Sequence, residues 1–167
     1  MSEHDTTWEE RQARRTALSP RRAAGVTEEM VQRVVHGFYA RIRGDALLGP
    51  VFNGAIGDRW DHHLAKMVDF WSSVLLMTGR YEGRPMAAHL MLDAKRGAEG
   101  MPRLDQPHFE HWLMLFRETA SELCPPEAAA LFIARAEKIA QSFVMGLRFQ
   151  RGETPDWLGP VRSEPSS

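Results

Sequence analysis

Apolar side chains recur with the period of an α-helix through nearly the whole of residues 25–151. In the first such stretch the apolar positions are Val31, Val34, Val35, Phe38 and Ile42. Because these residues are one, three and four positions apart, they share one face of a helix, where they can pack against a core. No stretch of the sequence is a convincing strand. The sequence therefore predicts an all-α fold.

Capping residues and glycines divide the helical pattern into separate elements. Thr27 is the expected N-cap of the first helix, and Gly44 is expected to end it. Asp58 is the expected cap of a second helix, which Gly79 would end, and the glycine-rich stretch around Phe52 between the two is predicted to be a loop. The other expected elements are helices at 85–92, after Asp105 and at 129–149, with a loop at 93–104.

A single domain accounts for this pattern. The chain has 167 residues, of which 43% are hydrophobic, and this is enough for one core. We expect the domain to occupy residues 25–151. A polar, arginine-rich tail would precede it at 1–24, and an irregular, proline-containing tail would follow it at 152–167.

Charge, cysteine content and hydropathy narrow the classes of function. The formal net charge of −1 gives the chain no general attraction to nucleic acid or to an anionic membrane. The single cysteine, Cys124, excludes an internal disulfide and any Cys-x-x-Cys site. The sequence has no apolar run of about 18 residues and no apolar leader segment. We therefore expect a cytoplasmic protein without a membrane partner.

Two histidines lie on successive predicted helices, where they could face each other across a flat cofactor. His63 is about 60° from the apolar face of its helix and so borders the core. His89 follows the turn at 81–85 and lies 26 residues after His63. A neutral imidazole is a common ligand of haem iron. The residue pattern alone does not choose between His89 and His108 as that ligand, and a hydrogen-bonded core histidine is the ordinary alternative for His63.

Other metal or cofactor chemistry finds little support in the motifs. His108 and His111 have an i, i+3 spacing that is compatible with a metal site, but no third ligand accompanies them. A di-iron carboxylate bundle needs Glu-x-x-His pairs, and the chain has none. P-loop, His-Glu-x-x-His and Gly-x-Gly-x-x-Gly motifs are absent as well. From the residues alone, a haem protein and a cofactor-free helix bundle both remain open.

Several segments carry a pattern more specific than helical periodicity. They are Phe38–Asp45 with Leu48–Asn53, Trp60-x-x-His63-x-x-Lys66-Met67-x-x-Phe70-Trp71, Tyr81-x-Gly83-x-Pro85-x-x-x-His89, and Phe109-x-x-Trp112-Leu113-x-Leu115-Phe116. In this order, over roughly residues 26–150, the chain resembles the group III truncated haemoglobins. One departure is the segment between His89 and Phe109, which is longer and richer in arginine and glycine than the family pattern.

The resemblance implies a shortened globin fold, in which helices packed two over two enclose haem b, an iron protoporphyrin. His89 would bind the iron through one ring nitrogen and donate a hydrogen bond from the other to a backbone carbonyl or water. Phe38 and Phe52 would pack on the porphyrin, and Lys66 would pair with a propionate.

The resemblance also implies a polar pocket over the open side of the iron, formed by Tyr39, His63, Met67 and Trp112. Three of these side chains carry hydrogen-bond donors, namely the phenol of Tyr39, the imidazole of His63 and the indole of Trp112. Two hydrogen bonds of about 1.4 kcal/mol each would hold oxygen about a hundredfold tighter. Such a pocket suits retention or reaction of oxygen better than its delivery.

Two classes of function follow from this pocket. In the first, the protein binds dioxygen and other small diatomic ligands and turns over peroxide or nitric oxide, with electrons from an unidentified reductase. In the second, it stores, carries or senses oxygen without catalysis. Turnover assays with peroxide and nitric oxide distinguish the two classes, and neither has a nucleic-acid or membrane partner.

Overall fold

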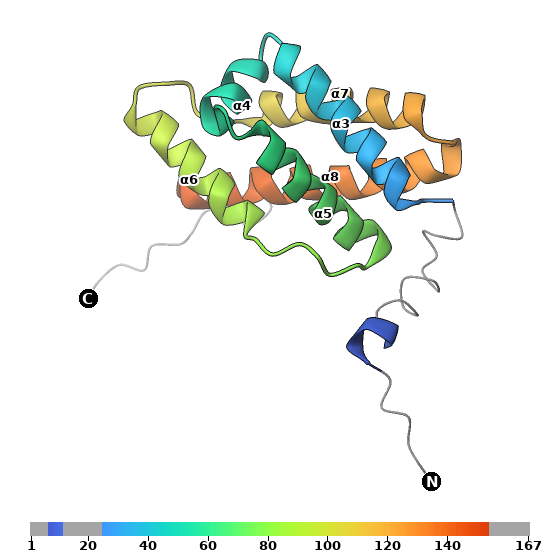
Figure 1. Cartoon of the computed structure of the whole chain (residues 1–167). Coiled ribbons are helices and arrows are strands. Elements are labelled where there is room, and N and C mark those ends of the chain that lie inside the picture. The colour runs from blue at the N-terminus through green and yellow to red at the C-terminus, as the bar shows by residue number, and fades with distance from the viewer. Residues whose placement is uncertain (1–6, 12–24, 154–167) are drawn as a thin grey trace, which may run out of the picture.

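The computed structural model of this chain describes residues 7–11 and 25–153, so most of the two expected tails lies outside the described residues. Residues 25–153 hold six helices and no strand, and the prediction of an all-α fold is confirmed (Figure 1). The helices are α3 (Glu28–Gly44), α4 (Gly49–Ile56), α5 (Trp60–Leu76), α6 (Pro85–Ala98), α7 (Gln106–Leu123) and α8 (Pro126–Gln150). None of the described helices combines the length and the apolarity that a membrane crossing requires.

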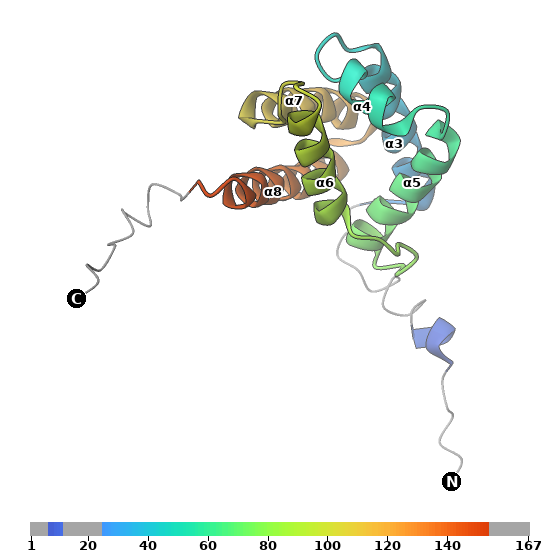
Figure 2. The same ribbon diagram turned by 90° about the vertical axis from the view of Figure 1, so that its left-hand side faces the viewer.

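The four long helices form two layers. Helix α3 packs against α5 in one layer, α7 packs against α8 in the other, and α3 also contacts α7 between the layers. Helix α4 packs against α3, and α6 packs against α8. Figure 2 shows α6 between α8 on one side and α5 on the other, so that α5 and α6 flank the same space. This is the two-over-two arrangement that the sequence led us to expect.

Aromatic side chains from both layers meet in the core. Phe38 of α3, Phe116 of α7 and Phe132 of α8 are among the largest fully buried side chains. The ring of Trp71 from α5 stacks on Phe116 with a centroid distance of 4.9 Å, and Phe38 meets Phe116 edge-on at 5.1 Å. Each such pair contributes about 0.5–1.5 kcal/mol beyond its buried area. The two layers are therefore held together without any help from α6.

The helix starts expected at Thr27 and Asp105 are confirmed. The side chain of Thr27 accepts a hydrogen bond from the amide of Met30 at 3.2 Å. Asp105 accepts from the amide of Gln106 at 2.8 Å, and His108 Nδ1 accepts in return from the amide of Asp105 at 3.1 Å. This reciprocal pattern is a capping box, and it gives His108 a structural role at the start of α7.

The stretch around Phe52 was expected to be a loop, and that expectation is wrong, because residues Gly49–Ile56 form helix α4. Pro50 lies in the first turn, where a missing amide hydrogen breaks no helical bond. Gly57 ends the helix with a φ of 62°, a conformation that glycine adopts at no steric cost. Glycine and proline thus delimit this helix instead of preventing it.

Helix α5 is shorter than expected at both ends. Its N-cap position is Arg59, not Asp58, and no side chain caps it. At the other end Met77 has a left-handed φ of 59°, and its amide bonds to the carbonyl of Ser73 at 3.1 Å. This bond satisfies one of the last carbonyls of the helix, so the helix stops before Gly79 is reached.

Helix α6 is longer than expected, because it runs to Ala98 and not to Leu92. The loop that follows is confined to residues 99–105. Gly97 lies in the last turn, where a Cβ would approach Arg103 Nε to 3.2 Å, so the absent side chain makes room for the returning loop. Helix α8 likewise starts earlier than expected, at Pro126.

Candidate functional site

The candidate site lies between α5, which carries His63, and α6, which carries His89. The pKa of His63 is lowered from 6.5 to about 4, mainly by burial and in smaller part by repulsion from a charge on His89. The two imidazoles are therefore close enough to interact electrostatically. His63 and His89, which the sequence placed on successive helices, thus lie in the same part of the fold.

His89 is oriented by the first turn of its own helix. Its Nδ1 lies 2.7 Å from the carbonyl oxygen of Pro85, four residues earlier, and a carbonyl can only accept a hydrogen bond. The proton of the neutral ring is therefore on Nδ1, which leaves a lone pair on Nε2. Burial lowers the pKa of His89, although its bond to Pro85 opposes this shift, so the ring is neutral at pH 7.

The ring of His89 is also fixed from one side by Phe143 of α8. The two rings stack with a centroid distance of 4.2 Å and an interplanar angle of 19°. Phe143 was not among the site residues expected from the sequence. No local pattern in the sequence could have found it, because the contact depends on how α6 packs on α8.

His63 carries the clearest sign of an incomplete site. Its Nε2 is buried and has no hydrogen-bond partner among the described residues. An unsatisfied buried polar nitrogen costs about 1–3 kcal/mol. The ring is held edge-on by Tyr39, at a centroid distance of 5.2 Å, and by Trp60 at 5.8 Å. The ordinary alternative, a hydrogen-bonded core histidine, is thus not what the structure shows for this ring nitrogen.

Tyr39 lies beside His63 and is buried, with 5% of its surface exposed. Burial raises the pKa of its phenol well above the usual value, with a smaller contribution from Tyr81. The hydroxyl therefore keeps its proton over the whole physiological range and can donate a hydrogen bond. Phe52 of α4 meets the Tyr39 ring at 6.0 Å, which places α4 next to this group.

Trp112 approaches from α7. Its ring stacks on Phe116 at 5.6 Å and meets Phe38 edge-on at 5.4 Å, and Phe38 in turn meets Tyr39 at 5.0 Å. Phe38 is 1% exposed and belongs to the core. Tyr39, His63, Phe38, Phe52 and Trp112 therefore form one connected group of rings.

The two remaining predicted residues lie on α5, one turn beyond His63. Met67 is half-buried and packs against the core. Lys66 is exposed, and its charge contributes to the lowered pKa of His63. Lys66 is thus at the solvent edge of the site, as a residue that pairs with an outward-facing carboxylate would be.

A hollow of about 310 Å³ opens between the end of α5, the start of α6 and α8. Its apolar wall includes Phe70, Pro85 and Phe143, so it reaches the residues that hold His89. Its other lining residues are Arg84, Met86, Arg135, Lys138, Ile139 and Ser142. Sequence reasoning missed the three cations, because only the packing of α6 on α8 brings them to one opening.

The other histidines lie away from this space. His36 and His62 are exposed. His111 Nε2 lies 2.6 Å from Asp45 Oδ2, and Asp45 also accepts from the amides of Leu47 and Leu48. Within the described residues no group of three or more His, Cys, Asp or Glu side chains could hold a metal ion. The i, i+3 pair of His108 and His111 is therefore structural.

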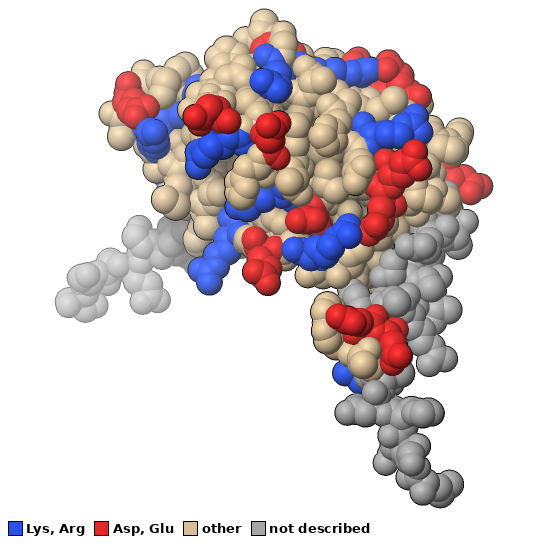
Figure 3. Space-filling view, in the orientation of Figure 1, with Lys and Arg blue, Asp and Glu red and all other residues tan. Residues whose placement is uncertain are grey.

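Charged side chains of both signs are interspersed on the face shown in Figure 3. Among the described residues, charged side chains also pair across elements, as Arg80 does with Glu28 at 2.8 Å. A surface of this kind has no stripe of one sign that would follow a polyanion.

The chain is similar to known truncated hemoglobins in sequence and in structure. The chain is 36% identical over 121 residues to the group 3 truncated hemoglobin ctb of Campylobacter jejuni, a match that covers 71% of this chain and 88% of that protein. Among solved structures it is similar to the crystal structure of the group III truncated hemoglobin from Campylobacter jejuni, with a TM-score of 0.64 and 34% identity over 73% of this chain and 91% of that one. No family model matches the sequence.

Proposed function

The chain belongs to the group III truncated haemoglobins, and from this membership we propose that it holds haem b between α5 and α6 and binds dioxygen and other small diatomic ligands there. A bound haem supplies an iron with one coordination position for a protein ligand and one for a small molecule. The role of the chain is to provide the protein ligand of the iron and to surround the small molecule.

The tautomer of His89 is the observation that carries this proposal. Its Nδ1–H donates to the carbonyl of Pro85, so Nε2 has a free lone pair, as a ligand of a metal ion requires. The stacked ring of Phe143 keeps the imidazole from turning. A histidine that only filled the core would not need both constraints. The residues present therefore fit a haem with His89 as its iron ligand.

The opposite wall supports a polar ligand. The buried Nε2 of His63 has no partner among the described residues, and the phenol of Tyr39 stays protonated beside it. Both groups can donate to a small ligand that carries partial negative charge, and the indole of Trp112 is a third donor. Two such bonds, at about 1.4 kcal/mol each, lower the ligand's dissociation constant about a hundredfold.

We also propose that this donor set supports turnover, with hydrogen peroxide or nitric oxide as substrates and a reductase as the electron source. Donors placed before the ligand arrives need no rearrangement when charge develops on it. The non-catalytic alternative is an oxygen store, carrier or sensor. Reversible oxygen binding without peroxide or nitric oxide consumption, in the presence of reductant, would favour that alternative.

Absorption spectroscopy tests the proposal directly. Purified protein titrated with haemin should bind one equivalent and give ferric, ferrous and carbonmonoxy spectra of a histidine-ligated haem. The variant His89→Ala should lose stoichiometric haem, because no other described side chain presents a free imidazole lone pair at that place. His62→Ala is the matched control, since His62 is exposed on α5. A normal Soret band in His89→Ala would refute the assignment of the ligand.

A further inference from the structure

A carboxylate is buried one helical turn beyond His89. Asp93 has none of its surface exposed. Burying a charge is costly unless it is paired and hydrogen-bonded. Asp93 forms an ion pair with Arg103 Nη2 at 2.7 Å, and it receives hydrogen bonds from Arg103 Nε at 3.0 Å, from Arg151 Nη2 at 2.8 Å and from the amide of Leu104 at 2.8 Å. These contacts lower the pKa of Asp93, although burial opposes the shift, so the carboxylate is ionised at pH 7.

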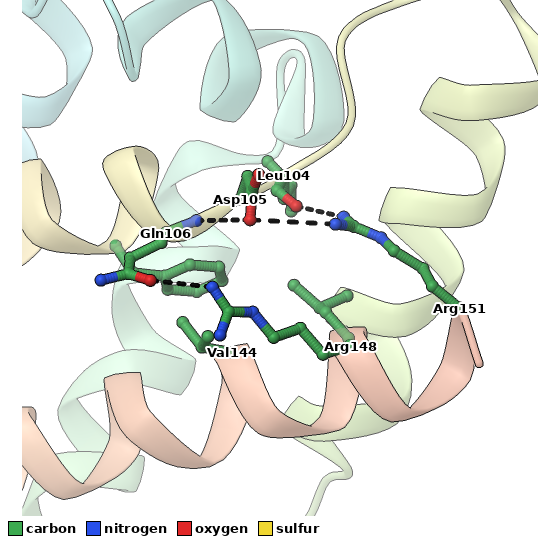
Figure 4. A pocket seen from close by; sticks show the side chains of 8 residues that line it. Leu104, Asp105, Gln106, Val144, Arg148 and Arg151 are labelled. Atoms are coloured by element: carbon green, nitrogen blue, oxygen red, sulfur yellow. Dashed lines mark hydrogen bonds and ion pairs between the residues drawn. The ribbon is translucent and has the colours of Figure 1, made fainter. Parts of the chain in front are cut away.

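The donors to Asp93 come from two other parts of the chain. Arg103 and Leu104 belong to the 99–105 loop, and Arg151 directly follows α8. Arg151 also donates to the carbonyl of Leu104 and lies 3.9 Å from Asp105 Oδ1 (Figure 4). We call this set, made of Asp93, Arg103, Leu104 and Arg151, the Asp93 clasp. It ties the end of α6 to the following loop and to the end of α8.

A further contact lies beside the clasp. Arg148 donates to Gln106 at 2.8 Å, which adds a second tie between α8 and the start of α7. Figure 4 shows Arg148 on α8 and Arg151 just after it reaching toward this segment. The depression between them, lined by side chains that include Val144 and Leu147, has no room for a water molecule.

Apart from the Asp93 clasp, helix α6 is held by half-buried side chains. His89 stacks on Phe143, and Leu90 and Leu92 pack against an apolar cluster that includes Leu147. Asp93 is the only buried residue of α6, and α8 is the helix against which α6 packs most closely. Its exposed positions include Ala87, Ala88 and Met91, the last with 73% of its surface exposed. A helix attached in this way can rotate or tilt unless a directional contact prevents it.

Asp93 and His89 are four residues apart, so they lie on the same face of α6. Rotation of the helix about its axis would move both side chains together. We propose that Asp93 is a positioning residue for His89, in that the Asp93 clasp fixes the rotation and tilt of α6 and thereby the place of His89 Nε2. The inference rests on the proposed function, because the positioned atom matters as a ligand of haem iron.

The variant Asp93→Asn tests the inference. It keeps the shape of the side chain and removes the charge that holds two arginines. In the ferrous, haem-loaded protein the iron–histidine stretching band, measured by resonance Raman spectroscopy, should shift and broaden relative to wild type. Glu137→Gln is the matched control, because it removes the same charge from the exposed pair that Glu137 forms with Arg117 at 2.7 Å. The control band should stay in place.

Hydrogen exchange in the haem-free protein gives a second measurement that needs no cofactor. Loss of a charged hydrogen bond at the clasp should speed exchange of the α6 amides about tenfold, with the α3 amides unchanged. If Asp93→Asn does not fold, Arg103→Gln replaces it, because this partner is 41% exposed and its loss leaves Arg151 in place. That variant should move both measurements in the same direction by a smaller amount.

The possible outcomes separate the two proposals. A wild-type protein that takes up no haem would refute the proposed function, and the inference about Asp93 would fall with it. Normal haem uptake with an unmoved iron–histidine band in Asp93→Asn would overturn the inference alone, even if α6 exchanged faster, since Asp93 would then only hold the helix. A shifted band together with faster exchange in α6 would support it.

Discussion

Replacement of Tyr39 by phenylalanine should make bound oxygen leave about ten times faster. The ring of Tyr39 meets Phe38 at 5.0 Å, His63 at 5.2 Å and Phe52 at 6.0 Å, and phenylalanine preserves all of these contacts. The change therefore removes one hydroxyl and leaves no cavity larger than one oxygen atom. What is lost is a hydrogen bond donated to the ligand.

The magnitude follows from the state of that hydroxyl. Burial raises its pKa, so the group is a full donor at neutral pH. A hydrogen bond to a partly charged acceptor contributes about 1.4 kcal/mol, which corresponds to a tenfold change in rate if the association step is unaffected. Substitution of Tyr39 by alanine would be a poor test, because the lost ring would cost about 3–5 kcal/mol of stability.

Stopped-flow displacement of oxygen by carbon monoxide measures the dissociation rate. The control is Tyr81→Phe, since Tyr81 is the other tyrosine of the chain and its ring packs edge-on against Phe70 at 5.2 Å. Its dissociation rate should equal that of wild type. An unchanged rate in Tyr39→Phe, at normal haem content, would show that the phenol makes no bond to the ligand and would refute the reasoning.

Two further predictions concern acid stability and haem retention. The pKa of His63 is about 4 in the folded chain and about 6.5 in an unfolded one, so the unfolded state binds more protons between these values and stability to urea should fall as pH falls through this window. His63→Phe should flatten that dependence of stability on pH. Part of the dependence should remain because of His89, whose pKa burial also lowers. An unchanged slope would contradict the assigned cause. Lys66→Gln should release haem to apomyoglobin several-fold faster than wild type. The control is Lys95→Gln, at an exposed position that pairs with Glu99, and it should release haem at the wild-type rate. Equal rates for the two variants would show that Lys66 does not pair with a propionate.

The long helices could be predicted from the sequence because their apolar faces are regular. Thr27 and Asp105 mark helix starts by local chemistry, and both start helices in the structure. Helix α4 could not be predicted from the sequence, because glycine and proline occur in loops as well as at the two ends of a short helix. The extension of α6 beyond Leu92 could not be predicted for another reason. It coincides with the contacts of Asp93 with Arg103 and Arg151, which depend on the tertiary fold.

The residues of the candidate site also divide into those that a local sequence pattern could place and those that depend on tertiary packing. Helical phase placed His63 at the core border, where it lies. Phase could not separate His89 from His108 as a ligand. The structure distinguishes them by hydrogen bonds, because His108 accepts from a helix cap and His89 donates to Pro85. Phe143, which stacks on His89, comes from a segment too distant along the chain for any local pattern to reveal.

The sparse anchoring of α6 has a consequence for the order in which the molecule is assembled. The two layers share an aromatic centre of their own, built on Phe38, Phe116 and Phe132, whereas α6 contributes a single buried residue. The two layers can therefore form before α6 docks, and α6 is the helix that we propose carries the iron ligand. Substitutions in α6 can then change the position of that ligand without disturbing the aromatic centre of the layers.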